Sequence, residues 1–415
     1  MRVVLSTWGS RGDVEPLAAL AVGLRELGAE ARVCAPPDEE FAELLSGVGV
    51  ELVPLGPTVR SVVAGERPPT AQDAFRLAPE LVAARFETLS AAAEGCDAIL
   101  ATGLMPAGAR DVAEVLGIPY VFACFHPFGL PSRHFRPGRR PGTPSPQDET
   151  DLKVLWEQDA QRVNCLYGEA LNRHRAALGL PPVDNVRDHV LTGRALLAAD
   201  PVLGPWQELT ELDLVQTGAW ILPDERPLPS DLQAFLASGE PPVYVGFGSM
   251  AAYAPKDVAQ VAIEVLRAQG RRVLLARGWA GLSRIDDKDD CFVVGEVNQQ
   301  ALFPRVAAVV HHGGAGTTTT AARAGAPQVV VPQIADQPHW AARVADLGIG
   351  VAHDGPTPTF ASLSAALGTA LSPETRARAK DVSRTIRTDG ATVAARLVLD
   401  AVDVGPLGPG AAQAP

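Results

Sequence analysis

One repeated pattern constrains the fold of this chain most strongly. In it, a short run of apolar residues is followed by a glycine-bearing turn and then by apolar residues at helical intervals. Arg2–Thr7 is predicted to be a strand, Trp8–Gly12 a turn and Val14–Leu27 a helix, because its apolar residues recur at helical intervals. The apolar runs are continuous and not alternating, which is typical of parallel strands covered on both faces. The pattern therefore predicts an α/β fold.

Further predicted strands lie on both sides of the proline-rich segment 220–242. Because 415 residues exceed what one hydrophobic core usually serves, we expect two doubly wound, Rossmann-like parallel-sheet domains. Their predicted limits are 1–216 and 243–404, with a linker at 217–242, a flexible tail at 405–415, and the alternative that the last helix, beginning near Thr392, returns to the first domain. The remaining predicted strands are Ala31–Ala35, Ala98–Thr102, Tyr120–Cys124, Arg272–Ala276, Cys291–Val294, Ala307–His311 and Gln328–Pro332.

The composition excludes several classes of protein. A net charge of −12 argues against a nucleic-acid partner, which requires a basic surface. The five cysteines are scattered without CxxC spacing, so we expect reduced thiols in a cytoplasmic protein. No apolar run approaches the ~20 residues that span a bilayer, and the first one is too short for a secretory signal. A soluble protein without stable membrane insertion is expected.

Three glycine-bearing turns follow predicted strands, at Gly9–Asp13, Gly246–Ser249 and His311–Thr317. None of them spells GxGxxG or GxxxxGK[ST]. The third turn indicates a phosphate site most strongly, because its glycines let backbone N–H groups approach an anion and a helix expected to begin near Thr317 directs its dipole there. A histidine beside such a turn can donate a further hydrogen bond. The alternative of turns without a ligand stays open, above all for the second turn.

Six segments, taken in order, resemble one known family. They are LSTWGSRGDVEP at 5–16, TGAWILPDERP at 217–227, YVGFGS at 244–249, RGW at 277–279, HHGGAGT at 311–317 and PQIADQ at 332–337. With them the chain resembles family-1 glycosyltransferases of the GT-B fold, especially the actinobacterial group that modifies glycopeptide antibiotics and aromatic polyketides. The resemblance implies two domains that face a deep cleft. It also implies inverting, metal-independent transfer of a hexosyl group from a nucleotide diphosphate to an aglycone hydroxyl in antibiotic biosynthesis.

The resemblance also implies roles for individual residues. Asp13 stands where relatives carry the catalytic base, and a carboxylate there can accept the acceptor proton; the alternative is an N-cap for the first helix. His312 corresponds to the histidine on the donor diphosphate, and Asp336 with Gln337 corresponds to the pair that holds the sugar. Asp336 is expected to be catalytic together with Asp13. His311 is predicted to pack inward. The remaining implied donor contacts are Ser10, Arg11, Gly12, Ser249, Trp279, Val297, Gly314, Ala315, Gly316, Thr317 and Thr320.

Thr320 departs from the pattern of plant relatives, which carry a glutamate eight residues after the phosphate histidine to grip the ribose hydroxyls. A deoxyribose lacks the 2′-hydroxyl, so a threonine fits a thymidine diphosphate (dTDP) donor better than a uridine one. The resemblance thus favours dTDP-sugars and leaves UDP-sugars open.

Two loops need separate interpretation. Asp287–Asp289 superficially matches a DxD metal motif, but it lies in a dense acidic run outside the glycine turns, so we expect a solvated loop, no metal site and no cofactor. The segment 129–148 is rich in proline and arginine and is predicted to be a substrate-side loop, with disorder as the alternative. Candidate acceptor contacts there and just before it are His126, Arg133 and His134.

The expected partners are a nucleotide-sugar and a small-molecule aglycone, bound by a monomer. Three other functions stay open: a sterol or lipid glycosyltransferase, a sugar-nucleotide 2-epimerase, and a non-catalytic binding protein with the same fold. Acceptor-dependent turnover separates the first from the other two.

Overall fold

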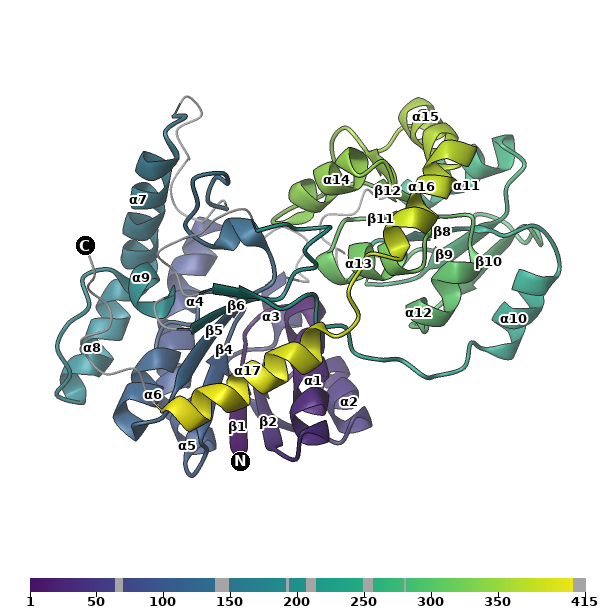
Figure 1. Cartoon of the computed structure of the whole chain (residues 1–415). Coiled ribbons are helices and arrows are strands. Elements are labelled where there is room, and N and C mark those ends of the chain that lie inside the picture. The colour runs from purple at the N-terminus through teal and green to yellow at the C-terminus, as the bar shows by residue number, and fades with distance from the viewer. Residues whose placement is uncertain are drawn as a thin grey trace. The chain divides into compact units, whose positions relative to one another are not determined.

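The computed structural model describes residues 1–63, 70–138, 149–191, 194–206, 214–248, 257–279 and 281–405. The chain divides into two compact units, each a parallel sheet flanked by helices (Figure 1). The first unit comprises Met1–Pro201, Pro205–Leu222 and Arg387–Pro415, and the second comprises Val202–Gly204 and Pro223–Ile386. The α/β class predicted from the apolar runs is confirmed.

The sheet of the first unit has seven strands in the order β3-β2-β1-β4-β5-β6-β7. The order reverses between β1 and β4, and at such a switch point ligands bind outside the carboxyl ends of the strands. The strands are β1 (Arg2–Ser6), β2 (Glu30–Ala35), β3 (Glu51–Pro54), β4 (Ala98–Ala101), β5 (Tyr120–Cys124), β6 (Arg194–Leu197) and β7 (Leu214–Gln216). The helices are α1 (Arg11–Glu26), α2 (Glu39–Gly47), α3 (Val59–Val63), α4 (Ala71–Ala84), η1 (Arg85–Leu89), α5 (Ser90–Ala93), α6 (Ala109–Leu116), η2 (Pro127–Gly129), α7 (Leu152–Val163), η3 (Asn164–Gly168), α8 (Glu169–Ala177), α9 (Val186–Leu191) and α17 (Gly390–Val404).

The sheet of the second unit has six strands in the order β10-β9-β8-β11-β12-β13, and its switch point lies between β8 and β11. The strands are β8 (Val243–Gly246), β9 (Val273–Ala276), β10 (Cys291–Val294), β11 (Ala308–His311), β12 (Gln328–Val330) and β13 (Gly350–Ala352). The helices are α10 (Ser230–Ala237), α11 (Val258–Ala268), α12 (Gln299–Leu302), η4 (Phe303–Arg305), α13 (Ala315–Arg323), α14 (Gln337–Asp346), α15 (Phe360–Ala370) and α16 (Pro373–Ser383).

Successive residues of β8 show why the apolar runs are continuous. Val243 and Val245 pack in a core with α11 and α15 on one face of the sheet. Tyr244 packs on the other face with residues of α10, α12 and α13. Because both faces are covered, every position of the strand is buried, as expected for a parallel sheet.

The last helix, α17, belongs to the first unit and packs on α1. A Cβ on Gly23 of α1 would lie 3.4 Å from the carbonyl oxygen of Ala391, so the two helices approach closely. The units divide at Leu222/Pro223, and α10 packs in the core of the second unit. The segment 217–242, predicted as a linker, is divided between the two units, with 217–222 in the first and 223–242 in the second. No helix of the described ranges has the length and apolar character needed to cross a membrane.

Candidate functional site

The third glycine turn connects β11 to α13. Gly314 is the N-cap, so α13 begins at Ala315, two residues earlier than predicted. The first four N–H groups of a helix have no partner within it, which leaves those of Gly314 to Thr317 available at the positive end of the helix dipole. Gly316 is exposed, whereas Gly314 and Ala315 are half-buried. The geometry suits an anion such as a phosphate group.

Gly313 fixes the path of this turn. Its φ of 94° is in the left-handed region that favours glycine. A Cβ at this position would lie 2.7 Å from Cγ1 of Val330 and 3.2 Å from the carbonyl oxygen of Gln337. The glycine therefore lets the turn pack directly against the start of α14, which carries Asp336 and Gln337.

His311 has a structural role in the turn. Its Nδ1 accepts the Gly313 N–H at 3.1 Å, and its Nε2 lies 2.9 Å from Oε1 of Gln328, to which it donates in this tautomer. Burial, together with the neighbouring His312, lowers the pKa of His311 to about 3. The His311 side chain is therefore neutral, packs inward and stabilises the turn.

His312 lies at the mouth of the turn. A Cβ on Gly314 would lie 2.7 Å from its Nε2, and a Cβ on Gly248 would lie 3.1 Å from its Cε1, so the ring packs between two glycines. Its Nδ1 is buried and has no hydrogen-bond partner among the described residues. Burial lowers the pKa of His312 to about 4, against an opposing effect of Asp336. The ring is neutral at pH 7 and can still donate one hydrogen bond to an oxyanion.

Asp336 and Gln337 begin α14. Oδ2 of Asp336 accepts the Trp340 indole N–H at 2.7 Å, which orients the carboxylate. Oε1 of Gln337 accepts the backbone N–H groups of Gln333 and Ile334 at 2.7 and 3.1 Å. Ala335 has a φ of 54°, a left-handed conformation that costs a non-glycine residue about 1 kcal/mol or more. The strained residue thus lies directly before Asp336, in the turn that leads into α14.

The second glycine turn and the Arg277–Trp279 turn pack against each other. The Trp279 N–H donates to the Gly248 carbonyl at 3.0 Å. Gly278 has a φ of 51°, and a Cβ there would lie 2.6 Å from that same oxygen. Through Gly248 this pair also contacts His312, so the structure brings the predicted residues Trp279, His312 and Asp336 into one region of the second unit. Ser249 lies outside the described residues.

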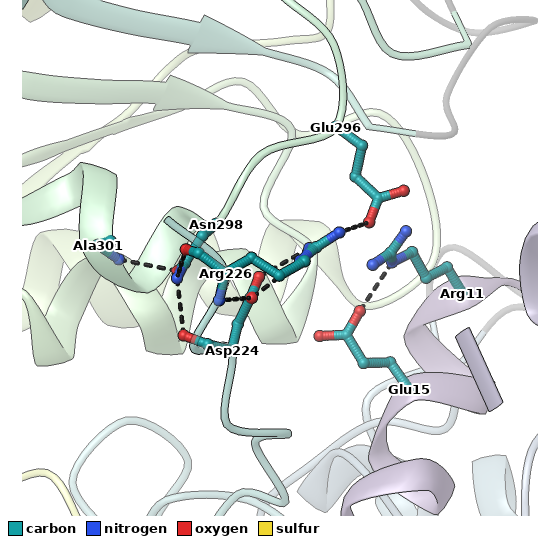
Figure 2. A network of polar contacts seen from close by, with 7 residues as sticks. All are labelled: Arg11, Glu15, Asp224, Arg226, Glu296, Asn298 and Ala301. Atoms are coloured by element: carbon teal, nitrogen blue, oxygen red, sulfur yellow. Dashed lines mark hydrogen bonds and ion pairs between the residues drawn. The ribbon is translucent and has the colours of Figure 1, made fainter. Parts of the chain in front are cut away.

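Val297 is half-buried and precedes Asn298, which the sequence interpretation missed. Nδ2 of Asn298 donates to the carbonyl oxygens of Asp224 and Arg226 at 2.7 and 2.9 Å, and its Oδ1 caps α12 by accepting the Ala301 N–H at 2.9 Å. Figure 2 shows this network, in which the Arg226 guanidinium also binds the carboxylate of Asp224 and, at 3.1 Å, that of Glu296. The loop that carries Val297 is thereby held in place.

The first glycine turn leads into α1, which begins at Arg11 and not at Val14. The N-cap is Ser10, whose Oγ accepts the Gly12 N–H at 3.3 Å, so the alternative of Asp13 as N-cap is wrong. Asp13 lies in the first turn of the helix, where a negative charge is favoured by the dipole. Its carboxylate packs on Gly9, where a Cβ would lie 2.1 Å from Oδ2.

Arg11 forms an ion pair with Glu15, with Nε 2.7 Å from the carboxylate (Figure 2). Both side chains are about one-third exposed, at 31% and 37%, so the pair contributes little to stability.

The candidate acceptor residues follow β5. The ring of His126 stacks on Phe128 at 4.0 Å. Burial raises the pKa of the Cys124 thiol, but His126 and nearby backbone groups outweigh it and lower the pKa. Arg133 and His134 are exposed beside Ser132, whose Oγ accepts the N–H groups of His134 and Phe135. Residues 139–148 of the predicted loop lie outside the described ranges.

The acidic segment 286–290 binds the side chain of an arginine. Arg267 binds both Asp286 and Asp290 at 2.7–2.8 Å, while Asp287–Asp289 are exposed and lie at none of the glycine turns.

One other group of possible metal ligands occurs among the described residues, formed by Asp111, Glu114 and His189. The buried guanidinium of Arg175 binds both carboxylates of this group. A guanidinium therefore already pairs with both acids, and the group lies on α6 and α9 of the first unit.

Comparison with known proteins supplies the family. Residues 3–129 match the glycosyltransferase family 28 N-terminal domain, and residues 278–394 match the C-terminal domain of erythromycin biosynthesis protein CIII-like proteins. Glycosyltransferase GtfE of Amycolatopsis orientalis is 59% identical over 405 residues, 97% of this chain and 98% of that protein. The vancomycin aglycone glucosyltransferase of the same organism is 59% identical over 404 residues, with the same coverage. Its dTDP-epi-vancosaminyltransferase is 53% identical over 412 residues, also 97% and 98%.

Solved structures agree on the fold. The glycotransferase of kitacinnamycin has a TM-score of 0.72 at 20% identity, covering 96% of this chain and 98% of its own. Glycosyltransferase VinC in complex with dTDP has a TM-score of 0.69 at 20% identity, covering 98% and 100%. The chain belongs to the GT-B glycosyltransferases of antibiotic biosynthesis, the family of the Amycolatopsis orientalis enzymes that it matches along nearly its whole length.

Proposed function

We propose that this enzyme transfers a hexosyl group from a dTDP-sugar to a hydroxyl of a glycopeptide aglycone, with inversion at the anomeric carbon. The observation that carries the proposal is the turn at His312, where a neutral histidine, a helix N-terminus and the start of α14 meet. The proposed acceptor class is that of the vancomycin aglycone glucosyltransferase, with which this chain shares 59% of the aligned residues.

The donor binds to the second unit. Its diphosphate accepts hydrogen bonds from the N–H groups of Gly314 to Thr317 and from His312, with Ser249 as a further contact. As the anomeric bond breaks, negative charge develops on the leaving diphosphate, and fixed dipoles at the start of α13 stabilise it. No metal ion is needed for this step, because backbone dipoles and His312 supply the charge stabilisation.

The sugar and nucleoside contact neighbouring loops. Asp336, oriented by Trp340, binds sugar hydroxyls with Gln337. Trp279 and Val297 contact the base. Thr320, which is 9% exposed on α13, faces the ribose. Its hydroxyl interacts only weakly with a 2′-hydroxyl, so dTDP is preferred to UDP.

The acceptor binds to the first unit. Asp13 takes the proton of the attacking hydroxyl, and Ser10, Arg11 and Gly12 contribute to binding near the donor phosphates. One displacement forms the glycosidic bond as the bond to the diphosphate breaks, so no covalent sugar-enzyme intermediate occurs. His126, Arg133 and His134 contact the aglycone. The enzyme works as a monomer in the cytoplasm, where its five free thiols stay reduced.

A sterol acceptor is the second candidate, because the sterol 3-beta-glucosyltransferase UGT80B1 of Arabidopsis thaliana is 28% identical over 430 residues, 95% of this chain and 67% of that protein. The test offers dTDP-glucose with either a glycopeptide aglycone or a sterol and follows both by mass spectrometry. We expect a mass increase of one hexose on the aglycone alone. Transfer to the sterol alone, or to neither acceptor, would refute the proposal.

A further inference from the structure

Arg85 is a fully buried arginine outside the residues discussed so far. It is 1% exposed and lies in η1, the single π-helical turn that joins α4 to α5. Within the described ranges no carboxylate pairs with it, and burial lowers its pKa to about 10. Burying an unpaired charge is expensive, so such an arginine needs compensating hydrogen bonds. A π turn within a helix also frequently marks a functional position.

The hydrogen bonds of Arg85 all go to one loop. Nη1 donates to the carbonyl oxygens of Met105 and Ala107, and Nη2 donates to that of Leu104, each at 3.1 Å. We call residues 103–108, between β4 and α6, the β4–α6 loop. Its last residue, Gly108, has a φ of 102°, and a Cβ there would lie 3.4 Å from Cβ of Arg85. The guanidinium therefore holds the loop in one conformation.

The other end of the β4–α6 loop is fixed to the turn that leads to Asp13. The Leu104 N–H donates to the Trp8 carbonyl at 3.1 Å. Gly103 has a φ of 81°, and a Cβ there would lie 2.9 Å from that oxygen. β1 and β4 are the strands of the switch point, so the loop lies at the sheet edge where ligands bind in such folds.

Leu104 is the one exposed residue of this loop. Its side chain is 40% exposed, whereas Met105 to Gly108 are buried and Gly103 is half-buried. A clamped backbone that presents a single leucine beside the Asp13 turn offers a fixed apolar contact, and apolar surfaces of this kind fit the aromatic rings of a peptide aglycone.

We propose that Leu104 is a specificity-determining contact for the apolar, aromatic part of the acceptor, and that Arg85 is the positioning residue that holds the β4–α6 loop. This inference rests on the proposed function. It adds a subsite that none of the sequence motifs indicated, because the three carbonyl partners of Arg85 follow it by about 20 residues.

The test measures the KM of the glycopeptide aglycone and of the dTDP-sugar for Leu104→Ser and Arg85→Met. Leu104→Ser removes the apolar contact that the exposed two-fifths of the leucine makes with the acceptor. We therefore expect the acceptor KM to rise about three- to eightfold, with the donor KM unchanged. Arg85→Met, which removes all three hydrogen bonds, is expected to raise the acceptor KM at least as much. Leu27→Ser is the matched control, because Leu27 is exposed to the same extent, at 39%, but lies at the C-terminal end of α1, away from Asp13.

An acceptor KM for Leu104→Ser no higher than that of Leu27→Ser would overturn the inference while leaving the proposed function intact. A donor KM that rises as much as the acceptor KM would also overturn it, because a general loss of structure moves both. If Arg85→Met does not fold, the acceptor KM of Leu104→Ser alone tests the inference. Failure of the wild-type enzyme to modify any aromatic peptide aglycone would refute the proposed function, and this inference with it.

Discussion

Replacing His312 by glutamine tests the diphosphate site through two independent quantities. The ring is neutral at pH 7 because burial lowers its pKa to about 4, so it contributes a hydrogen bond and no charge. A hydrogen bond to a charged group is worth about 1.5–3 kcal/mol. His312→Gln is therefore expected to weaken dTDP binding roughly 10- to 150-fold in isothermal titration. His174→Gln, on α8 of the other unit, is the control and should bind dTDP as the wild type does.

The same substitution changes how stability depends on pH. In the unfolded chain a histidine gains a proton below its usual pKa of 6.5, whereas folded His312 stays neutral down to about 4. The unfolded state thus binds more protons in this window, so stability is fully present above pH 6.5 and falls as the pH is lowered, by close to 1.4 kcal/mol per unit. His312→Gln should remove that contribution in urea unfolding, while His311 keeps its own. A dTDP affinity within twofold of wild type, or an unchanged pH dependence, would refute the reasoning.

Three further predictions concern the chemistry. Asp13→Asn should lower turnover by roughly 10²–10⁴-fold with dTDP affinity unchanged, and near wild-type turnover would remove Asp13 from the role of base. Activity should persist in excess EDTA; complete loss that Mg²⁺ restores would contradict stabilisation by dipoles alone. In competition between the dTDP and UDP forms of one sugar, the wild type should favour dTDP by roughly one to two orders of magnitude in kcat/KM. Thr320→Glu should shift this preference toward UDP, and an unaltered preference would mean that other residues hold the nucleoside.

Most strands that carry a continuous apolar run were predictable from the sequence, at the interior of a sheet as for β5 and at an edge as for β10. The predictions for Tyr120–Cys124 and Cys291–Val294 match β5 and β10 residue for residue. Four strands were not predicted. β3, β7 and β13 lie at sheet edges, are short and have only half-buried or exposed residues, whereas β6 lies inside its sheet and its residues 195–197 are buried. A strand with few buried residues, such as β3, β7 or β13, lacks the continuous apolar run that identifies a covered one.

Helix starts and supporting residues were harder to predict. Glycine and serine at the starts of α1 and α13 were assigned to the preceding turns, although Ser10 and Gly314 are N-caps. Arg85 and Asn298 escaped notice because their partners are distant in sequence: the carbonyls that Asn298 binds lie more than 70 residues away. Spacing along a chain does not reveal which loop a buried polar side chain holds.

The configuration of the product tests the central claim most directly. Wild-type enzyme would be incubated with an α-linked dTDP-hexose and a glycopeptide aglycone, and the anomeric proton of the purified product would be observed by NMR. Direct displacement assisted by Asp13, with departure of the diphosphate held at His312, predicts a β-glycoside. An α-glycoside would require two displacements or a front-face reaction and would contradict the account.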